Sequence, residues 1–342
     1  RAFLEVPNIE LSENDYDISV MEYELNGQIK ATTEYKGEIG EYSEPMEAVD
    51  RISKKRLKKH VAKLSVYRSI KKALNIELPW GSLTGIRPTK LLREVKSIEV
   101  LKEKYDLPLK KGRLLQRIID NQADFFTPEE DQTDIYIGIP FCKTRCTYCS
   151  FSSTDSIKGE KLMIPYVKAL IKEIEDTASL LKSLNKRVRC LYIGGGTPTA
   201  LTTRLFKDML ECTSVHFKPE LEFTVEAGRP DTITEEKLLL IKKAGADRIS
   251  INPQSMNETT LKKIGRSHSP KEIIDCYKIA RQVGFKTINA DLIAGLPDED
   301  PDMFFYTLDE VLKLKAENIT VHTLALKRGS KMFEQNMAFT NV

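Results

Sequence analysis

The chain has 342 residues, of which 41% are hydrophobic and 30% are charged, and its formal net charge is +3. This composition predicts a folded globular protein of about two domains and excludes a disordered chain. The small net charge gives no sign of a nucleic-acid partner, and no apolar run approaches the roughly 20 residues that a membrane-spanning helix needs. We therefore expect no nucleic-acid partner and no membrane span.

The first part of the sequence predicts a small α+β domain over residues 1–132. Alternating residues on both sides of Asn26-Gly27 are typical of a β-hairpin spanning residues 17–35. A helical pattern follows from about Pro45 to Asn75, and its basic run between Lys54 and Lys63 is interpreted as a solvated helix face in preference to a binding patch. The turn-rich loop 80–88 and two further helical stretches complete this region. The acidic segment 127–134 then marks a domain boundary.

The second part, residues 133–342, alternates short apolar strands with amphipathic helices. Strands are predicted at residues 135–139, 190–193, 221–226, 248–251, 287–293 and 319–324. Helices are predicted near residues 165–181, 203–213, 235–244, 271–282 and 303–314, with Pro165 in the first turn of the first helix. This order implies an α/β fold with a parallel sheet, a partial (β/α)6 TIM-like barrel. A closed barrel of eight units would need more chain.

Unusual residues follow the carboxyl ends of these predicted strands, where the sites of parallel barrels gather. The first strand leads into a cysteine-rich loop and the second into Gly194-Gly195-Gly196-Thr197. The third, fourth and fifth strands end near Glu226, Gln254 and Asp291. We expect these side chains to share one site.

Cysteines are few and unevenly placed, which favours a reducing, cytoplasmic compartment over a disulfide scaffold. Cys190, Cys212 and Cys276 are scattered, and we interpret them as small buried hydrophobic residues. The other three are Cys142, Cys146 and Cys149, in a C-x3-C-x2-C pattern. A disulfide would leave one thiol over, and a structural zinc site would need a fourth ligand that the sequence does not supply at suitable spacing. Three thiolates on a short loop suit a [4Fe–4S] cluster with one iron left open.

These motifs resemble the radical S-adenosylmethionine (SAM) superfamily. The segments Tyr136–Cys142, Gly194–Thr199, Arg248–Ser255 and Asp291–Pro297 are similar to the oxygen-independent coproporphyrinogen III oxidase group. Trp80–Leu92 and Val225–Asp231 resemble its coproporphyrinogen dehydrogenase branch, the HemZ-type proteins. The resemblance implies two cofactors, a [4Fe–4S] cluster and SAM. It also implies a C-terminal domain that is missing from this sequence.

The resemblance also implies a role for each matching residue. Cys142, Cys146 and Cys149 would bind the cluster, with Tyr136 and Tyr148 beside it. Gly195, Gly196 and Thr197 would meet the SAM amino group, because glycines let backbone polar atoms approach closely. Glu226, Gln254 and Asp291 would bind the amino and ribose hydroxyl groups, Arg266 would pair with the SAM carboxylate, and the backbone of Ala325 would meet the adenine.

The activity implied by the resemblance is oxidative decarboxylation of the propionates of coproporphyrinogen III, giving protoporphyrinogen IX in heme biosynthesis. The tetrapyrrole would be the substrate, and a flavodoxin or ferredoxin would be the reducing partner. Lys143, Arg145, Lys327 and Arg328 are candidate contacts for the anionic propionates.

Two alternatives share the same core. One is a heme-binding chaperone that keeps the cluster, and the other is a heme-degrading radical SAM methyltransferase. Phe151 stands where well-characterised members of the wider family have an additional cysteine, which keeps these alternatives open.

Overall fold

The computed structural model describes residues 18–46, 50–83, 87–126, 128–156 and 159–335. The chain divides into two compact units, Arg1–Thr127 and Pro128–Val342, which are described separately below. Residues 84–86 of the turn-rich loop, and residue 17 at the start of the predicted hairpin, lie outside the described residues.

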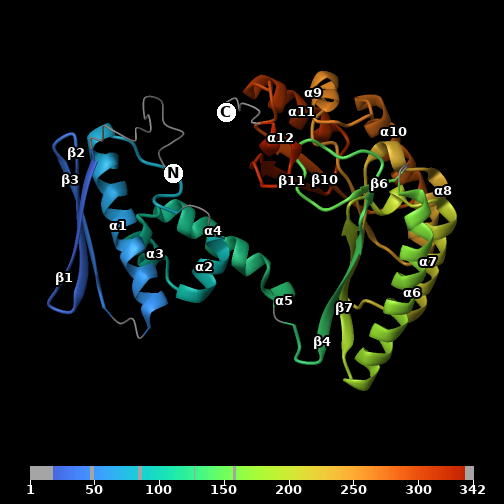
Figure 1. Ribbon diagram of the computed structural model, residues 1–342, viewed down its shortest axis with the longest axis horizontal. Coiled ribbons are helices and arrows are strands. Elements are labelled where there is room, and N and C mark those ends of the chain that lie inside the picture. The colour runs from blue at the N-terminus through green and yellow to red at the C-terminus, as the bar shows by residue number, and fades with distance from the viewer. Residues whose placement is uncertain (1–17, 47–49, 84–86, 127, 157–158, 336–342) are drawn as a thin grey trace. The chain divides into compact units, whose positions relative to one another are not determined.

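The N-terminal unit contains an antiparallel sheet of three strands packed on one long helix (Figure 1). The strands are β1 (Ile18–Leu25), β2 (Gln28–Tyr35) and β3 (Glu38–Pro45), and the helix is α1 (Arg51–Leu74). Asn26 and Gly27 have φ angles of 49° and 73°, as the predicted hairpin turn requires. Ile29 and Ala31 of the sheet pack against side chains of α1 that include Leu64.

The third strand, β3, was not predicted from the sequence. The segment contains three glutamates, a residue type that is uncommon in strands, so its sequence gives only a weak β-strand signal. Gly40 lets β3 pack closely against α1, because a Cβ atom at this position would lie only 2.1 Å from the backbone oxygen of Ser65 in α1. The tertiary contact with α1 therefore selects the strand.

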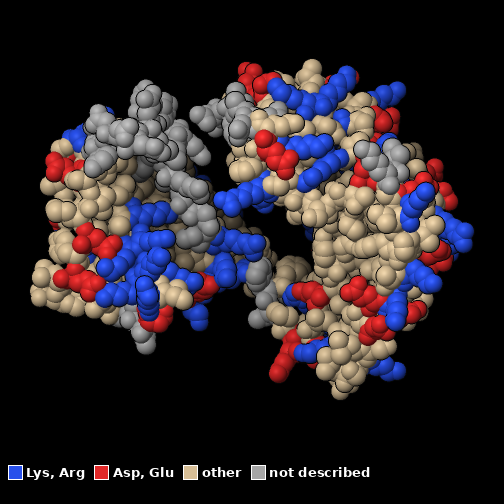
Figure 2. All heavy atoms as spheres, in the orientation of Figure 1, with Lys and Arg blue, Asp and Glu red and all other residues tan. Residues whose placement is uncertain are grey.

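Helix α1 begins at Arg51, later than the predicted start near Pro45. The extended backbone of Asp50 caps the helix, and its carboxylate accepts hydrogen bonds from the N–H groups of Ile52 and Ser53. Of the basic run, Lys54 and Lys58 form ion pairs with Glu24 of β1. Figure 2 shows Lys and Arg side chains gathered on this unit and interspersed with Asp and Glu, the mixed pattern of a solvated surface.

Short helices complete the N-terminal unit. Where two helical stretches were predicted, the structure has α2 (Pro88–Val95), α3 (Ile98–Tyr105), α4 (Leu109–Asn121) and the short α5 (Ala123–Phe126). Lys96 and Asp106 take left-handed conformations at the ends of α2 and α3 and divide the helical pattern. The apolar side chains of α2 to α4 meet around Leu92, Leu101 and Leu115.

The C-terminal unit is built on six parallel strands in the order β11-β10-β9-β8-β7-β4. These strands are β4 (Gln132–Ile139), β7 (Arg187–Gly195), β8 (Glu222–Gly228), β9 (Arg248–Ile251), β10 (Thr287–Ala294) and β11 (Asn318–Thr323). All six predicted strands are confirmed, and the sheet curls into the predicted partial TIM-like barrel. Among the described residues, no helix combines the length and apolar character that crossing a bilayer requires.

Helices cover the outer face of this sheet. They are α6 (Glu160–Ser183), α7 (Thr203–His216), α8 (Glu235–Lys243), α10 (Pro270–Val283) and α11 (Pro301–Lys313). The end of α9 (Glu258–Lys263) and the start of α12 (Lys331–Glu334) instead meet the cysteine loop, where the backbone of Thr147 hydrogen-bonds to Ile264 and to Met332. Leu191 and Val225 of the strands pack against Val167 of α6 and Phe206 of α7 in one apolar core. Figure 1 shows α6 and α7 side by side along this face.

One helix start differs from the prediction. Helix α6 begins at Glu160, so Pro165 lies in its second turn and the prediction of a first-turn proline was wrong. The proline removes the hydrogen bond to the carbonyl group of Lys161. Both residues are exposed, so water can serve that carbonyl group.

Candidate functional site

The cysteine loop leaves the barrel after β4 and is pinned at both ends by a short parallel strand pair. Cys142 lies in β5 (Phe141–Cys142), which pairs with β6 (Thr154–Asp155). The carbonyl oxygen of Cys142 accepts a hydrogen bond of 2.7 Å from the N–H of Ser156. Cys146 is buried, Cys142 and Cys149 are half-buried, and all three thiols are free. The three thiols therefore project from a loop with a fixed base.

A buried arginine fixes the middle of this loop. Arg229, which follows β8, is 3% exposed. Its Nη1 donates to the carbonyl oxygen of Thr144 at 2.7 Å and to the hydroxyl of Thr144 at 2.8 Å, and it lies 3.9 Å from the sulfur of Cys146. The carboxylate of Asp231 holds the other side of the guanidinium, with an Nε–Oδ1 distance of 3.0 Å. Arg229 was not among the predicted site residues, although it lies in the segment Val225–Asp231 that carries the resemblance.

The glycine-rich turn after β7 lies against the first cysteine. The N–H of Gly196 donates to Ile139 and that of Thr197 to Phe141, at 2.7 and 2.8 Å. Gly195 has a φ of 108°, which a side chain would strain. A Cβ atom on Gly196 would lie 2.9 Å from the sulfur of Cys142. Position 196 therefore has no room for a side chain, whereas the hydroxyl of Thr197 reaches the same thiol at 3.5 Å.

Glu226 and two tyrosines form a second group on the inner face of the sheet. The hydroxyl of Tyr192 donates to Glu226 at 2.7 Å, and Tyr136 stacks on Tyr192 with ring centroids 5.8 Å apart. Burial, together with the nearby charge of Asp291, raises the pKa of Glu226. Tyr136 is 63% exposed, and its ring stacks within this group. Tyr192 was not predicted as a site residue. The one sequence feature that relates it to the site is its position, two residues before the glycine turn.

Gln254 and Asp291 meet at the ends of β9 and β10. The N–H of Gln254 donates to the carbonyl oxygen of Asp291 at 2.9 Å, and Gln254 has a φ of 68°, which is uncommon for a residue with a side chain. Its buried Oε1 atom has no hydrogen-bond partner among the described residues. Asn289 donates to the carboxylate of Asp291 at 2.8 Å. A strained residue with an unpaired buried acceptor is typical of a ligand site.

Arg266 joins the cysteine loop to β9. This guanidinium is buried, and it donates to the carbonyl oxygen of Asn252 at 2.7 Å and to the hydroxyl of Tyr148 at 3.2 Å. Its Nε atom has no partner among the described residues and remains available to an anion. Tyr148 thereby lies next to Arg266, and burial raises the pKa of its hydroxyl group.

A cavity of about 340 Å³ opens beside the third cysteine. Its lining includes Tyr148, Cys149, Gln254, Asp291 and Ala325. The volume is within the usual range of small-molecule sites. The structure thus gathers five predicted residues around one cavity and places Gly195–Thr197 against Cys142. Three free thiols, a side-chain-free turn and unpaired buried polar atoms fit a cluster and a SAM molecule.

Comparisons with known proteins agree with this site. Residues 136–311 match the model of the radical SAM superfamily. The chain is 40% identical to the oxygen-independent coproporphyrinogen-III oxidase-like protein HemZ of Bacillus subtilis, over 96% of this chain and 66% of that protein. It is 34% identical to the heme chaperone HemW of the same species, over 56% of this chain and 50% of that protein.

A solved structure is also similar. Coproporphyrinogen III oxidase (HemN) of Escherichia coli superposes with a TM-score of 0.51 and 25% identity, over 63% of this chain and 54% of that chain. The chain thus spans between one half and two thirds of the length of these relatives. The chain belongs to the radical SAM superfamily, within the group that contains HemN, HemZ and HemW.

Proposed function

We propose that this protein oxidatively decarboxylates the propionate side chains of coproporphyrinogen III. The observation that carries the proposal is the 40% identity with the HemZ protein over 96% of the chain, which includes the N-terminal unit. Similarity to HemW covers only 56% of the chain. The shared N-terminal unit therefore favours the HemZ-type activity.

The three cysteines would bind three irons of the cluster and leave the fourth iron to SAM. When bound, the reduced cluster supplies the electron that cleaves SAM. Arg229 would place an N–H group beside the sulfur of Cys146, and the bare backbone of Gly196 would leave room at Cys142. The protein therefore fixes the loop on both sides of the cluster.

The remaining residues would orient SAM. The Nε atom of Arg266 would donate to the SAM carboxylate, because it is buried and unpaired. Gly195–Thr197 and Glu226 would accept hydrogen bonds from the amino group. The carboxylate of Asp291 and the amide of Gln254 face the cavity, where they would bind the ribose hydroxyls, and the backbone of Ala325 would meet the adenine.

Of the four candidate propionate contacts, two already have partners in the protein. The Nζ of Lys143 lies 3.1 Å from the carbonyl oxygen of Asp231, and Arg145 donates to the carbonyl oxygen of Gly329. Lys327 lines the cavity, and Lys327 and Arg328 are both exposed. These two are the better candidates for a propionate.

Heme carriage is the second candidate function, and Phe151 is the observation that favours it. Phe151 is 64% exposed at the cavity, where it stands in place of the additional cysteine of other family members. An exposed aromatic ring offers a flat apolar surface to a tetrapyrrole. Under this reading the protein binds heme and does not convert a porphyrinogen.

The deciding experiment uses the anaerobically reconstituted protein with SAM, dithionite and coproporphyrinogen III. We expect vinyl product together with matching 5′-deoxyadenosine, and loss of both in Cys146→Ala. A ferredoxin or flavodoxin would then replace dithionite as reductant. Tight heme binding without porphyrinogen turnover would overturn the proposed decarboxylation in favour of carriage.

A further inference from the structure

Helices α6 and α7 bring three metal-binding side chains together on the outside of the barrel. These are Glu175 of α6, and Cys212 and His216 of α7. Their carboxylate, sulfur and ring-nitrogen atoms all lie within 4.8 Å of one another. Glu175 and His216 are exposed and Cys212 is half-buried. Cys212 was interpreted above as a small buried hydrophobic residue; it packs against the apolar core of the barrel, and its sulfur also lies near the two other donors.

The helical spacing makes this grouping rigid. Cys212 and His216 are four residues apart and lie on the same face of α7. That face is turned toward α6, because the sulfur of Cys212 lies 3.9 Å from the carbonyl oxygen of Ile171. Glu175 is one helical turn after Ile171 on α6. Each donor therefore comes from a long helix, and none comes from a loop.

Two of these three donors have no other partner in the described part of the chain. The Glu175 carboxylate forms no ion pair or hydrogen bond there, and neither does the His216 imidazole. The Cys212 thiol lies 3.9 Å from the carbonyl oxygen of Ile171, a long and weak hydrogen bond. A thiol, an imidazole and a carboxylate therefore lie close together.

We propose that Glu175, Cys212 and His216 bind a divalent ion of the zinc class that joins α6 to α7. Thiolate, imidazole and carboxylate are all zinc ligands, and three protein ligands leave the fourth tetrahedral position to water. Zinc lies about 2.0–2.3 Å from such atoms, so bound ligands stand roughly 3.5 Å apart. Small rotations of exposed side chains close the remaining gap.

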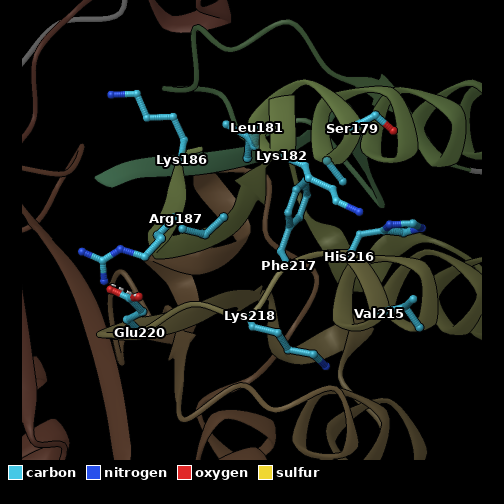
Figure 3. A pocket seen from close by; sticks show the side chains of 12 residues that line it. Ser179, Leu181, Lys182, Lys186, Arg187, Val215, His216, Phe217, Lys218 and Glu220 are labelled. Atoms are coloured by element: carbon cyan, nitrogen blue, oxygen red, sulfur yellow. Dashed lines mark hydrogen bonds and ion pairs between the residues drawn. The ribbon is translucent and has the colours of Figure 1, made fainter. Parts of the chain in front are cut away.

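The site lies away from the cysteine loop. Cys212 and His216 end α7, just before the chain enters the amino end of β8, whereas the cysteine loop follows the carboxyl end of β4. His216 also borders a cavity of about 490 Å³, shown in Figure 3. Ser179 and Lys182, which follow Glu175 on α6, line the same cavity. Solvent from this cavity can supply the fourth ligand.

The test uses Co²⁺ as a spectroscopic probe on the cluster-loaded holoprotein under anaerobic conditions. The difference spectrum against cobalt-free holoprotein is recorded, and Zn²⁺ is then added as competitor. We expect the visible bands of tetrahedral Co²⁺ with a thiolate charge-transfer band, both of which Zn²⁺ displaces. Removing an outer-shell partner of a metal ligand already weakens binding about tenfold or more, so Cys212→Ser, His216→Gln and Glu175→Gln should each weaken it at least as much.

Cys190→Ser is the matched thiol control, since Cys190 is also half-buried but lies on β7. Its cobalt spectrum should equal that of the wild type. Absence of the tetrahedral spectrum in the wild type, or an unchanged spectrum in both Cys212→Ser and His216→Gln, would overturn the proposal. His216 is exposed, so His216→Gln tests the site even if Cys212→Ser does not fold. Iron content and SAM cleavage, measured on the same samples, report the cluster site independently.

Discussion

The guanidinium of Arg229 holds Thr144 by two hydrogen bonds from a single nitrogen, to its carbonyl oxygen at 2.7 Å and its hydroxyl at 2.8 Å. Thr144 lies midway between Cys142 and Cys146, so this contact fixes the spacing of two of the proposed cluster ligands. The same guanidinium is paired with Asp231 and is almost fully buried. The cluster loop and β8 are therefore joined by one charged side chain.

Arg229→Met should destabilise the protein and its cluster together. The substitution leaves Asp231 buried without its main cation, and breaking a buried pair in this way costs about 3–5 kcal/mol. Urea unfolding of the apoprotein measures the first effect, and iron retained against a chelator measures the second. Arg248→Met is the control, because Arg248 and Glu222 are a partly exposed pair worth less than about 1 kcal/mol. Equal losses of unfolding free energy and of bound iron in Arg229→Met and Arg248→Met would contradict the role of Arg229.

Gly196→Ala should abolish cluster binding while the chain still folds. The added Cβ atom would lie 2.7 Å from the oxygen of Phe141 and 2.9 Å from the sulfur of Cys142, closer than real Cβ contacts allow. Iron content and the visible absorption of the reconstituted protein measure the result. Gly138→Ala is the matched control on β4, since its Cβ atom would meet only the exposed ring of Tyr136 at 3.3 Å. A normal iron content in Gly196→Ala would show that the turn does not crowd the cluster.

Asp291→Asn should weaken SAM binding without loss of iron. Hydrogen bonds to a charged group contribute about 1.5–3 kcal/mol, so the expected change in Kd is roughly tenfold or more. Calorimetric titration of the cluster-loaded protein with SAM measures it. Glu222→Gln provides the comparison, because Glu222 lies on β8, separated from β10 by β9, and is paired with Arg248. We expect wild-type SAM affinity in Glu222→Gln, and unchanged affinity in Asp291→Asn would refute the ribose contact.

Glu226→Gln should stabilise the apoprotein at neutral pH. Burial and the charge of Asp291 raise the pKa of Glu226 above 4.5, so the folded state holds this proton more tightly than the unfolded state. The wild type therefore loses stability as pH rises from about 4.5 through the raised pKa, because its folded state must then carry a buried charge.

The glutamine variant buries no charge at this position. Its excess free energy of unfolding over the wild type should therefore become smaller as the pH falls. Urea unfolding of both proteins between neutral and mildly acidic pH measures the difference. If the difference in the free energy of unfolding did not change with pH, ionisation of Glu226 could not be its cause. The same variant should bind SAM more weakly, the exchange of stability for function that binding sites often show.

The sequence by itself determined the barrel and the candidate residues at its centre. Apolar runs of strand length between amphipathic helices predicted six parallel strands, because a strand that is buried on both faces is apolar along most of its length. The cysteine spacing and the glycine turn predicted the cluster site, since both depend on residues that are neighbours in the chain.

Only the tertiary structure decided the contacts between distant segments. It selected β3 through the approach of α1 to Gly40 and placed Arg229 against Thr144. It also turned Tyr136 toward Tyr192 and brought Glu175 beside Cys212 and His216. These pairs are separated by many residues, and periodicity reports which face a residue occupies but not which partner it meets there.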